Sequence, residues 1–575
     1  MLAASLAVTP FAIMSRPLAG VRNNTLILTL PGSPKGAKEN LQSVIKMLPH
    51  ACQQAAGMDS RQLHSGGTEK LEKDAGVTAG TEVSSAGHHH HHHHHEHDHS
   101  HKHGHAGHAI PKAHTNPEDR PAVSNDPTAG PTRRYRESPY PMLSVDDALK
   151  QISENTPEPQ VVTAPVDENL VGSVLAEDVT AKESVPAFRA SIVDGYAIIA
   201  SKHMMVPSTK GRFPVVGISH AEAGEGEADE LRIGEVARIT TGAPLPPGAT
   251  SVVMVEDTVL KSLTDDGEEE NEIEVLTADI EPGENVREVG SDVQAGSVVM
   301  KKGEGITAVG GEFGLLASVG TQEVKVYKKP SVGVLSTGDE IIPHNRVGDL
   351  RHGEVRDTNR PTLLTAIRNS GFEAVDLGIA SDKPGALEQT LRDAMRRVDV
   401  IVTSGGVSMG ELDLLKPTIE RQLGGTIHFG RVSMKPGKPT TFATVPFKTN
   451  GGERETKAIF SLPGNPASAV VTYHLFVLPS LHKMGGINPV GLPRVKVVLE
   501  QDVKCDTKRA EYHRVLVSVK ADGRLAATST GGQRSSRIGS FKGANGLLCL
   551  PTTQPSLKKG EICDALMMGK ILSEL

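Results

Sequence analysis

The sequence predicts a multi-subdomain α/β protein in which a doubly wound parallel sheet is flanked by β-rich subdomains and a C-terminal β domain. Two observations predict this fold. Between residues 331 and 487, short apolar strands alternate with helical segments, which is the pattern of parallel βαβ units. In residues 186–330 and 490–575 the chain instead carries short strands rich in Val and Thr. The length of 575 residues allows roughly four domains at about 150 residues each.

Residues 1–55 are expected to belong to a larger folded unit, the C-terminal part of a domain. Thr25–Leu30 is a short apolar strand, the PGSPKG that follows is typical of a turn, and Glu39–Leu48 has helical spacing. About fifty residues are too few to bury their own apolar face without staples.

Residues 56–137 are predicted to be a disordered linker. They are rich in Gly, Ser, Thr and Pro and contain a histidine tract from His88 to His108. Such a segment buries too little apolar surface to offset its chain entropy. Histidine tracts can also bind zinc or copper, so metal capture stays open beside the simpler interpretation as a solvated linker.

The globular part, residues 138–575, begins with the N-terminal and β-rich subdomains of residues 138–330. Leu143–Ile152 has the spacing of a helix, and Glu323–Tyr327 is one of several short strands, as is Val252–Val255. The acidic run DDGEEENEIE predicts a solvated hairpin tip or loop.

The doubly wound subdomain covers residues 331–487, and residues 488–575 form a small β domain with the strands VKVVLEQD, EYHRVLVSVK and LAATST. In the doubly wound part we expect strands at 331–337, 372–380, 399–406 and 457–464, and helices at Thr358–Ser370, Lys383–Val398, Leu412–Leu423 and Pro466–Met484.

Composition excludes several classes of function. The net charge is −8, from 61 basic and 69 acidic residues, which does not favour binding to nucleic acid or to an anionic membrane. There is no Trp and only 3% aromatic residues, which argues against base-stacking platforms. Four scattered cysteines indicate a reducing compartment. No apolar run is long enough for a transmembrane helix, and Pro10 interrupts an N-terminal run without preceding Lys or Arg, so we expect a cytosolic protein.

Four loops are expected to carry the chemistry, because ligands of doubly wound sheets bind beyond the carboxyl ends of the strands. They are STGDE, TSGGVSMGELD, MKPGKP and SLPGNPAS. Glycines let backbone N–H groups approach an anion, and Lys435 and Lys438 add positive charge. Glu340, Glu411 and Asp413 are suited to Mg²⁺. Any one loop is more often a simple turn, but together they indicate a phosphorylated or pyrophosphate-bearing ligand.

Two further segments place polar residues in tight contexts. In SIVDGYA, Asp194 precedes Gly-Tyr within an apolar run, and in ITTGAP a turn contains Thr240 and Thr241. Taken alone, Asp194 is more often the residue of an Asx turn than a ligand.

Seven motifs give the chain a resemblance to the molybdenum-insertion enzymes of molybdenum cofactor biosynthesis. In order, they are SIVDGYA, ITTGAP, STGDE, RDTNR, SGGVSMGELD, MKPGKP and SLPGNPAS. Residues 138–575 resemble the E domain of the gephyrin family. Residues 1–50 are similar to the end of that family's G domain, a molybdopterin adenylyltransferase.

The resemblance implies an enzyme that inserts molybdate into adenylylated molybdopterin with Mg²⁺, releasing AMP and the molybdenum cofactor. It also implies a homodimer in which the Asp194 segment faces the sheet of the partner subunit. Most of the G-domain pattern, including its GGTG-type loops, has no counterpart here, so we expect no adenylyltransferase activity from this chain.

The resemblance also implies roles for individual residues. Asp194, Asp292 and Asp413 are the catalytic carboxylates; together with Glu340 they are candidate metal ligands, and Asp357 is expected to line the cleft. The expected substrate- and phosphate-binding residues are Thr240, Thr241, Ser336, Thr337, Gly338, Ser404, Gly405, Gly406, Lys435, Lys438, Pro463, Gly464 and Ser468.

A second class of function stays open. Gephyrin-type proteins also cluster inhibitory receptors by docking receptor cytoplasmic loops on the E-domain dimer, which implies a peripheral location at the postsynaptic membrane. The seven motifs concern only the catalytic cleft. Binding to a receptor cytoplasmic loop would distinguish the scaffold from the enzyme. A third interpretation, a zinc or copper buffer, predicts that metal uptake is lost when residues 88–108 are deleted.

Overall fold

The computed structural model describes residues 19–22, 25–29, 140–201, 208–221, 229–381, 385–406, 414–449 and 451–573, together with Ala37, Leu41, Leu48 and Cys52. The chain forms two compact units, Met1–Lys112 and Ala113–Leu575. In the first, β1 (Ala19–Arg22) pairs antiparallel with β2 (Thr25–Leu28), which confirms the strand expected after Asn24. The predicted helix Glu39–Leu48 and the linker lie outside the described residues, apart from single positions.

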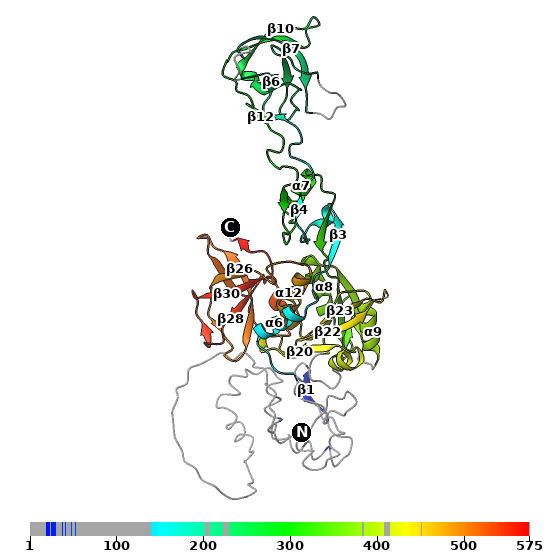
Figure 1. Cartoon of the computed structure of the whole chain (residues 1–575). Helices are drawn as coiled ribbons and strands as arrows, with labels where there is room; N and C mark the ends of the chain where they lie inside the picture. The colour runs from blue at the N-terminus through cyan, green and yellow to red at the C-terminus, as the bar shows by residue number, and fades with distance from the viewer. Residues whose placement is uncertain are drawn as a thin grey trace. The chain divides into compact units, whose positions relative to one another are not determined.

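Residues 161–326 of the second unit, here called the arm, are built mainly of strands. Their largest sheet has six strands in the order β10-β11-β7-β8-β6-β9, and three two-stranded ladders accompany it (Figure 1). The arm contains β3 (Val161–Pro165), η4 (Glu168–Leu170), β4 (Val179–Thr180), β5 (Ala190–Ser191), β6 (Gly195–Ile198), β7 (Gly211–Ser219), β8 (Val236–Ile239), β9 (Ser251–Met254), η5 (Val255–Asp257), β10 (Thr258–Leu263), β11 (Glu270–Val275), β12 (Val286–Arg287), β13 (Val298–Met300), α7 (Gly311–Ser318) and β14 (Glu323–Tyr327).

The acidic run of the sequence forms a hairpin tip. Strands β10 and β11 pair antiparallel, and the Oγ1 of Thr264 donates to Asp266 while Gly267 takes a positive φ of 74° in the turn. The carboxylate of Asp266 also accepts from the backbone N–H of Glu268. The acidic side chains are therefore solvated or used within the turn, as the sequence predicts.

The α/β part is a six-stranded mixed sheet with the order β18-β15-β19-β23-β22-β20. The pairs β18–β15, β15–β19 and β19–β23 are parallel, which confirms the doubly wound prediction, whereas β22 and β20 are antiparallel additions at one edge. The strands β20 and β22 were not predicted from the sequence; of this edge region only the MKPGKP loop was. The strands are β15 (Val332–Thr337), β16 (Ile341–Ile342), β17 (Val355–Arg356), β18 (Ala374–Ala380), β19 (Val400–Ser404), β20 (Thr426–Phe429), β21 (Met434–Lys435), β22 (Thr441–Lys448) and β23 (Arg454–Leu462).

Helices cover both faces of this sheet, and the predicted helix Pro466–Met484 is confirmed as an unbroken helical run made of α11, η7 and α12. It contains a π turn, η7, immediately before Pro479. Proline has no N–H to donate to the preceding turn, and the wider π turn accommodates that missing hydrogen bond. The helices are α6 (Val145–Asn155), α8 (Asn359–Asn369), α9 (Ala386–Met395), α10 (Leu415–Pro417) with the π turn η6 (Thr418–Gln422), α11 (Pro466–Thr472), η7 (Tyr473–Val477) and α12 (Leu478–Met484).

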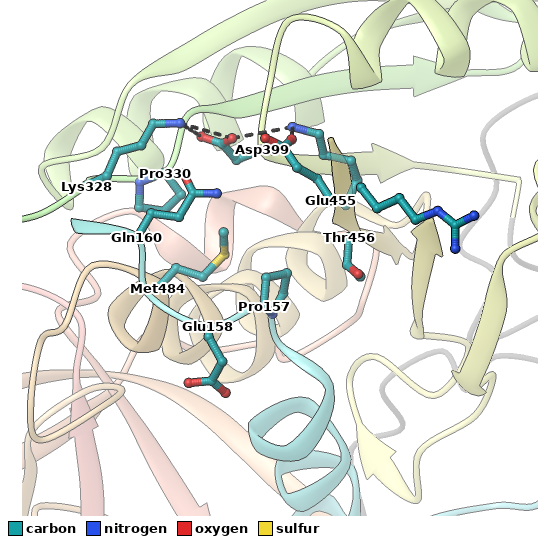
Figure 2. Close-up of a pocket in the computed structure, with 11 residues that line it drawn as sticks. Pro157, Glu158, Gln160, Lys328, Pro330, Asp399, Glu455, Thr456 and Met484 are labelled. Carbon is teal, nitrogen blue, oxygen red and sulfur yellow. Dashed lines mark hydrogen bonds and ion pairs between the residues drawn. The ribbon is translucent and has the colours of Figure 1, made fainter. Parts of the chain in front are cut away.

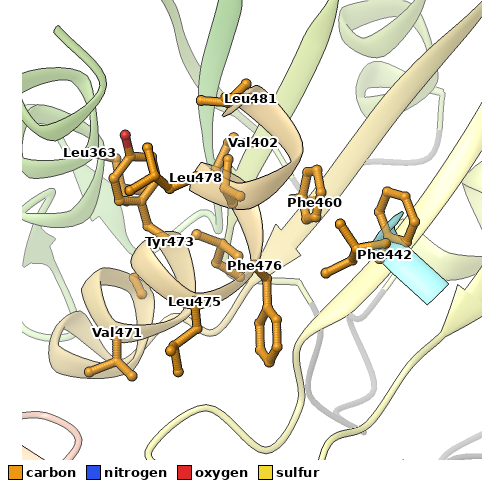
Figure 3. Packing of buried hydrophobic residues seen from close by; sticks show 14 of the residues in the cluster. Leu363, Val402, Phe442, Phe460, Val471, Tyr473, Leu475, Phe476, Leu478 and Leu481 are labelled. Carbon is orange, nitrogen blue, oxygen red and sulfur yellow. The ribbon is translucent and has the colours of Figure 1, made fainter. Parts of the chain in front are cut away.

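The largest core lies between the sheet and the chain from α11 to α12 (Figure 3). Phe442 and Phe460 come from adjacent strands and stack with ring centroids 4.7 Å apart. Phe429 adds an edge contact to Phe476 with centroids 6.1 Å apart. Complete burial of several aromatic side chains fixes the strand register and so the positions of the strand ends.

The C-terminal β domain closes into a barrel, because β26 pairs with both β27 and β28. The small domain predicted from its short strands is therefore present. Its elements are β24 (Arg494–Leu499), β25 (Val503–Lys504), β26 (Ala510–Val519), β27 (Leu525–Ser529), η8 (Ile538–Phe541), β28 (Gly546–Leu550), β29 (Ser556–Leu557), β30 (Ile562–Met567) and β31 (Leu572–Ser573). Across the described part of the chain, no helix combines the length and apolarity needed to cross a bilayer.

The π turn gives a pH-dependent prediction. The ring Nδ1 of His474 is buried and has no hydrogen-bond partner among the described residues, and burial lowers the pKa of His474 to about 4. Below pH ~6.5 the imidazole of His474 is therefore protonated in the unfolded chain, whereas in the folded chain it stays neutral until the pH approaches 4. We expect the free energy of unfolding to fall as the pH drops from ~6.5 towards 4, and H474Q to flatten that slope. Urea titrations at several pH values measure the free energy of unfolding of each variant. If its slope against pH is the same for H474Q as for H352Q, the control at an exposed histidine, the prediction is contradicted.

Candidate functional site at the sheet edge

Three of the four predicted loops begin side by side at the carboxyl edge of the sheet. In the parallel register Ser336 lies opposite Ser404, and Ser404 lies opposite Leu462. The segments STGDE, TSGG and LPGNP therefore leave adjacent strands β15, β19 and β23 at the same level. The structure brings together Ser336, Thr337, Gly338, Ser404, Gly405, Gly406, Pro463 and Gly464.

Asn359, at the start of α8, connects these loops. Its Nδ2 donates to the Oγ of Ser404 at 2.6 Å and to the carbonyl oxygen of Gly464 at 2.8 Å. Gly464 and Gly405 are also close, since a Cβ added to Gly464 would lie 3.7 Å from the Cα of Gly405. One buried amide thus joins the loops after β19 and β23 to the RDTNR motif. Asn359 was not among the site residues predicted from this motif.

Packing explains the glycine pair after β19. Gly405 and Gly406 have φ values of 95° and 65°, where side-chain-bearing residues are strained. A Cβ on Gly405 would lie 2.8 Å from the carbonyl oxygen of Thr337 and 2.9 Å from its Oγ1. The backbone N–H of Gly405 donates to Leu462 at 3.1 Å. The glycines therefore bring three strand ends into contact, whatever ligand the loops receive.

Several hydroxyl groups at this edge have no hydrogen-bond partner among the residues that the structure describes. The buried side-chain oxygens of Ser336, Thr403, Thr441 and Ser461 lack hydrogen bonds within the described residues. Thr403, Ser461 and Thr441 occupy one register row across β19, β23 and β22. An unsatisfied buried hydroxyl costs about 1–3 kcal/mol, so such groups usually bind water or ligand. The edge therefore keeps hydrogen-bonding capacity that the described chain does not use.

The MKPGKP loop meets the C-terminal barrel. Strand β21 pairs with β26, and the Nζ of Lys435 forms an ion pair with Asp506, which holds the pKa of Asp506 down at about 2. Lys435 is therefore already partly neutralised by the chain itself. Lys438 is exposed and forms none of the ion pairs found among the described residues. Of the two predicted lysines, Lys438 has the greater capacity to neutralise a bound anion.

The barrel also contributes residues that sequence analysis missed. The Oγ of Ser535 accepts from the Nδ2 of Asn465 at 3.2 Å, and its carbonyl accepts from Ala467 N–H at 3.0 Å. Arg514 is 1% exposed, and burial lowers its pKa to about 10. Its Nε donates to Ser540 at 3.1 Å, but no carboxylate pairs with it in the described chain. The signal in the sequence is an arginine within the apolar strand pattern EYHRVLVSV.

The carboxylates of the arm form a separate group. The Oδ1 of Asp194 accepts from the backbone N–H of Thr241 at 2.7 Å and from its Oγ1 at 3.1 Å. The structure thus joins SIVDGYA to ITTGAP and replaces the local Asx turn with a long-range contact. Asp292 forms an ion pair with Arg287. These described contacts lie within the arm and do not join Asp194 or Asp292 to the sheet edge.

The remaining predicted site residues lie in several different surroundings. Glu340 is exposed, with its carboxylate folded over Gly338. Asp357 is 3% exposed, and its carboxylate binds the N–H and Nε of Arg360, so it holds α8 and does not line the cleft. Ser468 is buried in α11, and Thr240 is half-buried in the turn before Thr241. Glu411 and Asp413 lie outside the described residues.

The described carboxylates do not form a magnesium site within one chain. No group of three or more His, Cys, Asp or Glu side chains with metal-binding proximity occurs in the described ranges. Asp292 already forms an ion pair with Arg287, and one carboxylate oxygen of Asp194 already accepts hydrogen bonds from Thr241. The described carboxylates of one chain therefore do not fit Mg²⁺ by themselves, and the expected ligand Asp413 lies outside the described residues.

Three family descriptions match successive parts of the chain. Residues 143–320 match the MoeA N-terminal region (domain I and II), residues 333–483 a probable molybdopterin binding domain, and residues 496–568 the MoeA C-terminal region (domain IV). Gephyrin from Dictyostelium discoideum is 36% identical, covering 99% of this chain and 81% of the relative. The chain belongs to the gephyrin family.

Other relatives extend this relationship. The molybdenum cofactor synthesis protein cinnamon of Drosophila melanogaster is 34% identical over 97% of this chain and 80% of its own. A molybdopterin molybdenumtransferase from Haemophilus influenzae is 31% identical over 73% of this chain and 97% of its own. The crystal structure of a molybdopterin biosynthesis MoeA protein from Pyrococcus horikosii superposes with a TM-score of 0.60 and 29% identity, covering 75% of this chain and 100% of that one.

The role of Asn359 gives a prediction about stability. N359D keeps the shape of the side chain but replaces its donor group with a carboxylate facing the Gly464 carbonyl, so we expect a loss of about 1–3 kcal/mol in the free energy of unfolding. The control N369D makes the same change at an exposed position of α8. Urea denaturation measures both variants. An N359D loss no larger than that of N369D contradicts the role assigned to Asn359.

Proposed function

We propose that this chain acts in molybdenum cofactor biosynthesis as a molybdopterin molybdotransferase, inserting molybdate into adenylylated molybdopterin with release of AMP. The observation that carries this function is the meeting of three glycine-containing loops at the carboxyl edge of the part that matches a probable molybdopterin binding domain. Asn359 joins two of these loops, and Gly405 packs against Thr337 of the third. The related molybdopterin molybdenumtransferases support the reaction class.

The chemistry requires release of AMP from a pyrophosphate. An oxygen nucleophile, from water or molybdate, attacks phosphorus while the phosphoanhydride P–O bond breaks and AMP takes the bridging oxygen. Negative charge accumulates on the phosphoryl oxygens, and preorganised donors and cations stabilise it. We assign this role to Lys438, supported by its exposure and freedom from described ion pairs, and to the hydroxyls of Ser404 and Ser336 at the strand ends.

Arg514 is a second candidate for anion binding. Its guanidinium donates to the Oγ of Ser540 and to the carbonyl oxygen of Arg534, and the carboxylate of Glu511 acts on its charge without forming an ion pair, so the buried positive charge is incompletely neutralised. Its neighbours Arg534 and Ser540 belong to the segment that also holds Asn465, which follows Gly464. We propose that this side of the edge receives an oxyanion, for which molybdate is the substrate expected.

The carboxylates Asp194 and Asp292 act in our proposal from the arm of a second copy. Exposed apolar side chains accompany them, since Phe188, Ile192 and Val289 are each about half exposed. Apolar groups beside polar ones are typical of surfaces that become buried in oligomers. A homodimer would bring these carboxylates to a partner's sheet edge. Magnesium stays part of the proposal, and in the dimer its carboxylate ligands come from two chains. We place the enzyme in the cytosol, as the cysteine content favours.

Single-turnover conversion tests the proposed function. Purified full chain is mixed with adenylylated molybdopterin, molybdate and Mg²⁺, and AMP and active cofactor are measured. We expect D292N to lower the rate at least ~100-fold, because in our proposal Asp292 helps to hold the Mg²⁺ that neutralises the phosphoryl oxygens, and loss of that stabilisation costs several kcal/mol. The exposed arm residue Asp279 provides the control D279N. Thermal melts identify any unfolding of D292N. No product from the folded wild-type chain contradicts the function, and a wild-type rate in D292N contradicts that residue's assignment.

We propose one cavity as the candidate docking site for the alternative scaffold role. A space of about 520 Å³ lies between α6, α12 and the barrel, with apolar walls that include Leu149, Leu475 and Tyr512. Its size suits a few side chains of an extended peptide. Titration with a receptor cytoplasmic loop tests it. If the loop does not bind at micromolar concentration, or binds L149D as well as the wild type, this cavity is not the docking site of a receptor loop.

A further inference from the structure

Two chain segments connect the arm to the α/β part, and both pass the amino end of the sheet. Residues 156–160 lead from α6 into β3, and residues 327–331 lead from β14 into β15. The two segments are tied to each other, because the backbone N–H of Lys328 donates to the carbonyl of Gln160 at 2.7 Å. The extensive contacts of the arm's elements are with other elements of the arm. The connecting segments therefore control how the arm is held.

Asp399 binds the second connecting segment. It precedes β19, and its Oδ2 accepts from the backbone N–H of Ser331 at 3.0 Å and from the Oγ of Ser331 at 3.2 Å. The Nζ of Lys328 lies 3.1 Å from the same oxygen (Figure 2). Lys457, on β23, approaches the other oxygen at 3.5 Å. One carboxylate thus joins the connection to two strands of the sheet.

Burial strengthens this arrangement. The Asp399 side chain is 16% exposed at the wall of a cavity of about 240 Å³ that lies between the two connections and the sheet. Burial alone would raise the pKa of Asp399, but the Ser331 N–H, Lys328 and Lys457 together lower it. The carboxylate therefore remains charged, and partly buried ion pairs are screened less than surface pairs.

A second group of contacts binds the first connecting segment. The Nζ of Lys483, on α12, donates to the carbonyl of Ser153 at 2.9 Å and to Glu158 at 2.8 Å. The hydroxyls of Thr156 and Ser480 lie 2.8 Å apart and are buried. These contacts hold the chain at the end of α6, upstream of the arm. Asp399 and Lys328 instead act at the segment by which the chain returns from the arm.

We propose that Asp399 is a positioning residue that, through Lys328 and Ser331, holds the arm in the orientation needed for turnover. Asp399 lies at the amino end of β19, and the other end of this short strand is Ser404 of the candidate site. The arm carries Asp194 and Asp292. The inference rests on the proposed function in one respect, namely that these carboxylates act on substrate bound at a sheet edge.

The test measures arm position and turnover separately in the full chain. Spin labels on cysteines introduced by D266C, in the arm, and R397C, in the α/β part, report the distance by pulsed electron resonance. Cys52 and Cys505 are replaced by Ser, whereas Cys549 and Cys563 stay because burial raises the pKa of their thiols to about 12 and about 11. Labelled chain is diluted with unlabelled chain so that only distances within one chain are seen.

The variants are chosen to retain the fold. D399N keeps an oxygen for the Ser331 N–H, and Lys457 keeps its contact with Glu455 at 2.9 Å. K328Q removes the same ion pair from the other side. K325Q is the matched control, because Lys325 pairs with Glu177 at 2.9 Å entirely within the arm. K328R restores the charge.

For D399N and K328Q we expect about a twofold wider distance distribution and about a fivefold lower single-turnover rate, with substrate affinity unchanged. K325Q should match the wild type, and K328R should recover most of the rate. An unchanged distribution in D399N overturns the inference, as does a wider distribution at a wild-type rate. If the wild-type chain shows no turnover, the proposed function fails, and the distance measurement alone then decides whether Asp399 holds the arm.

Discussion

The buried amide of Asn359 is the interaction on which the candidate site depends. Its two donors are satisfied by the Ser404 hydroxyl and the Gly464 carbonyl, which belong to loops far apart in sequence. The backbone of Arg360 is fixed in turn by Asp357, so the start of α8 has little freedom. The glycines after β19 permit the close contact with Thr337 that this arrangement requires. A rigid set of strand ends results, with hydroxyls left for a ligand.

Charge is distributed unevenly around this edge. Lys435 is paired with Asp506, whereas Lys438 and Arg514 have no carboxylate partner in the described chain. The acidic residues assigned to catalysis lie on the arm, where Thr241 and Arg287 hold them. Placing Asp194 and Asp292 on the arm keeps them away from Lys438, although the arm's own Arg287 already pairs with Asp292. This placement also makes the reaction depend on how the arm is held, which connects the site to Asp399.

Much of the α/β part could be predicted from sequence, because buried parallel strands and amphipathic helices have strong local patterns. β15, β18, β19 and β23 all lie where apolar runs predict them. The antiparallel strands β20 and β22 were not predicted. The helix Pro466–Met484 was predicted with its observed bounds, but the π turn inside it was not. Asn359 was missed because its partners, Ser404 and Gly464, lie 45 and 105 residues further along the chain. The local sequence around RDTNR does not show which of its polar side chains makes such distant contacts. The partners of Asp357 and Lys435 are equally nonlocal.

The central claim is that the edge joined by Asn359 receives the phosphate end of the substrate. The most direct measurement is a crystal structure of the full chain with AMP and molybdate. The account predicts the AMP phosphate within hydrogen-bonding distance of the loop that begins at Ser404 and of Lys438, with Asn359 still bound to Gly464. AMP bound elsewhere, with this edge holding only water, would contradict the account.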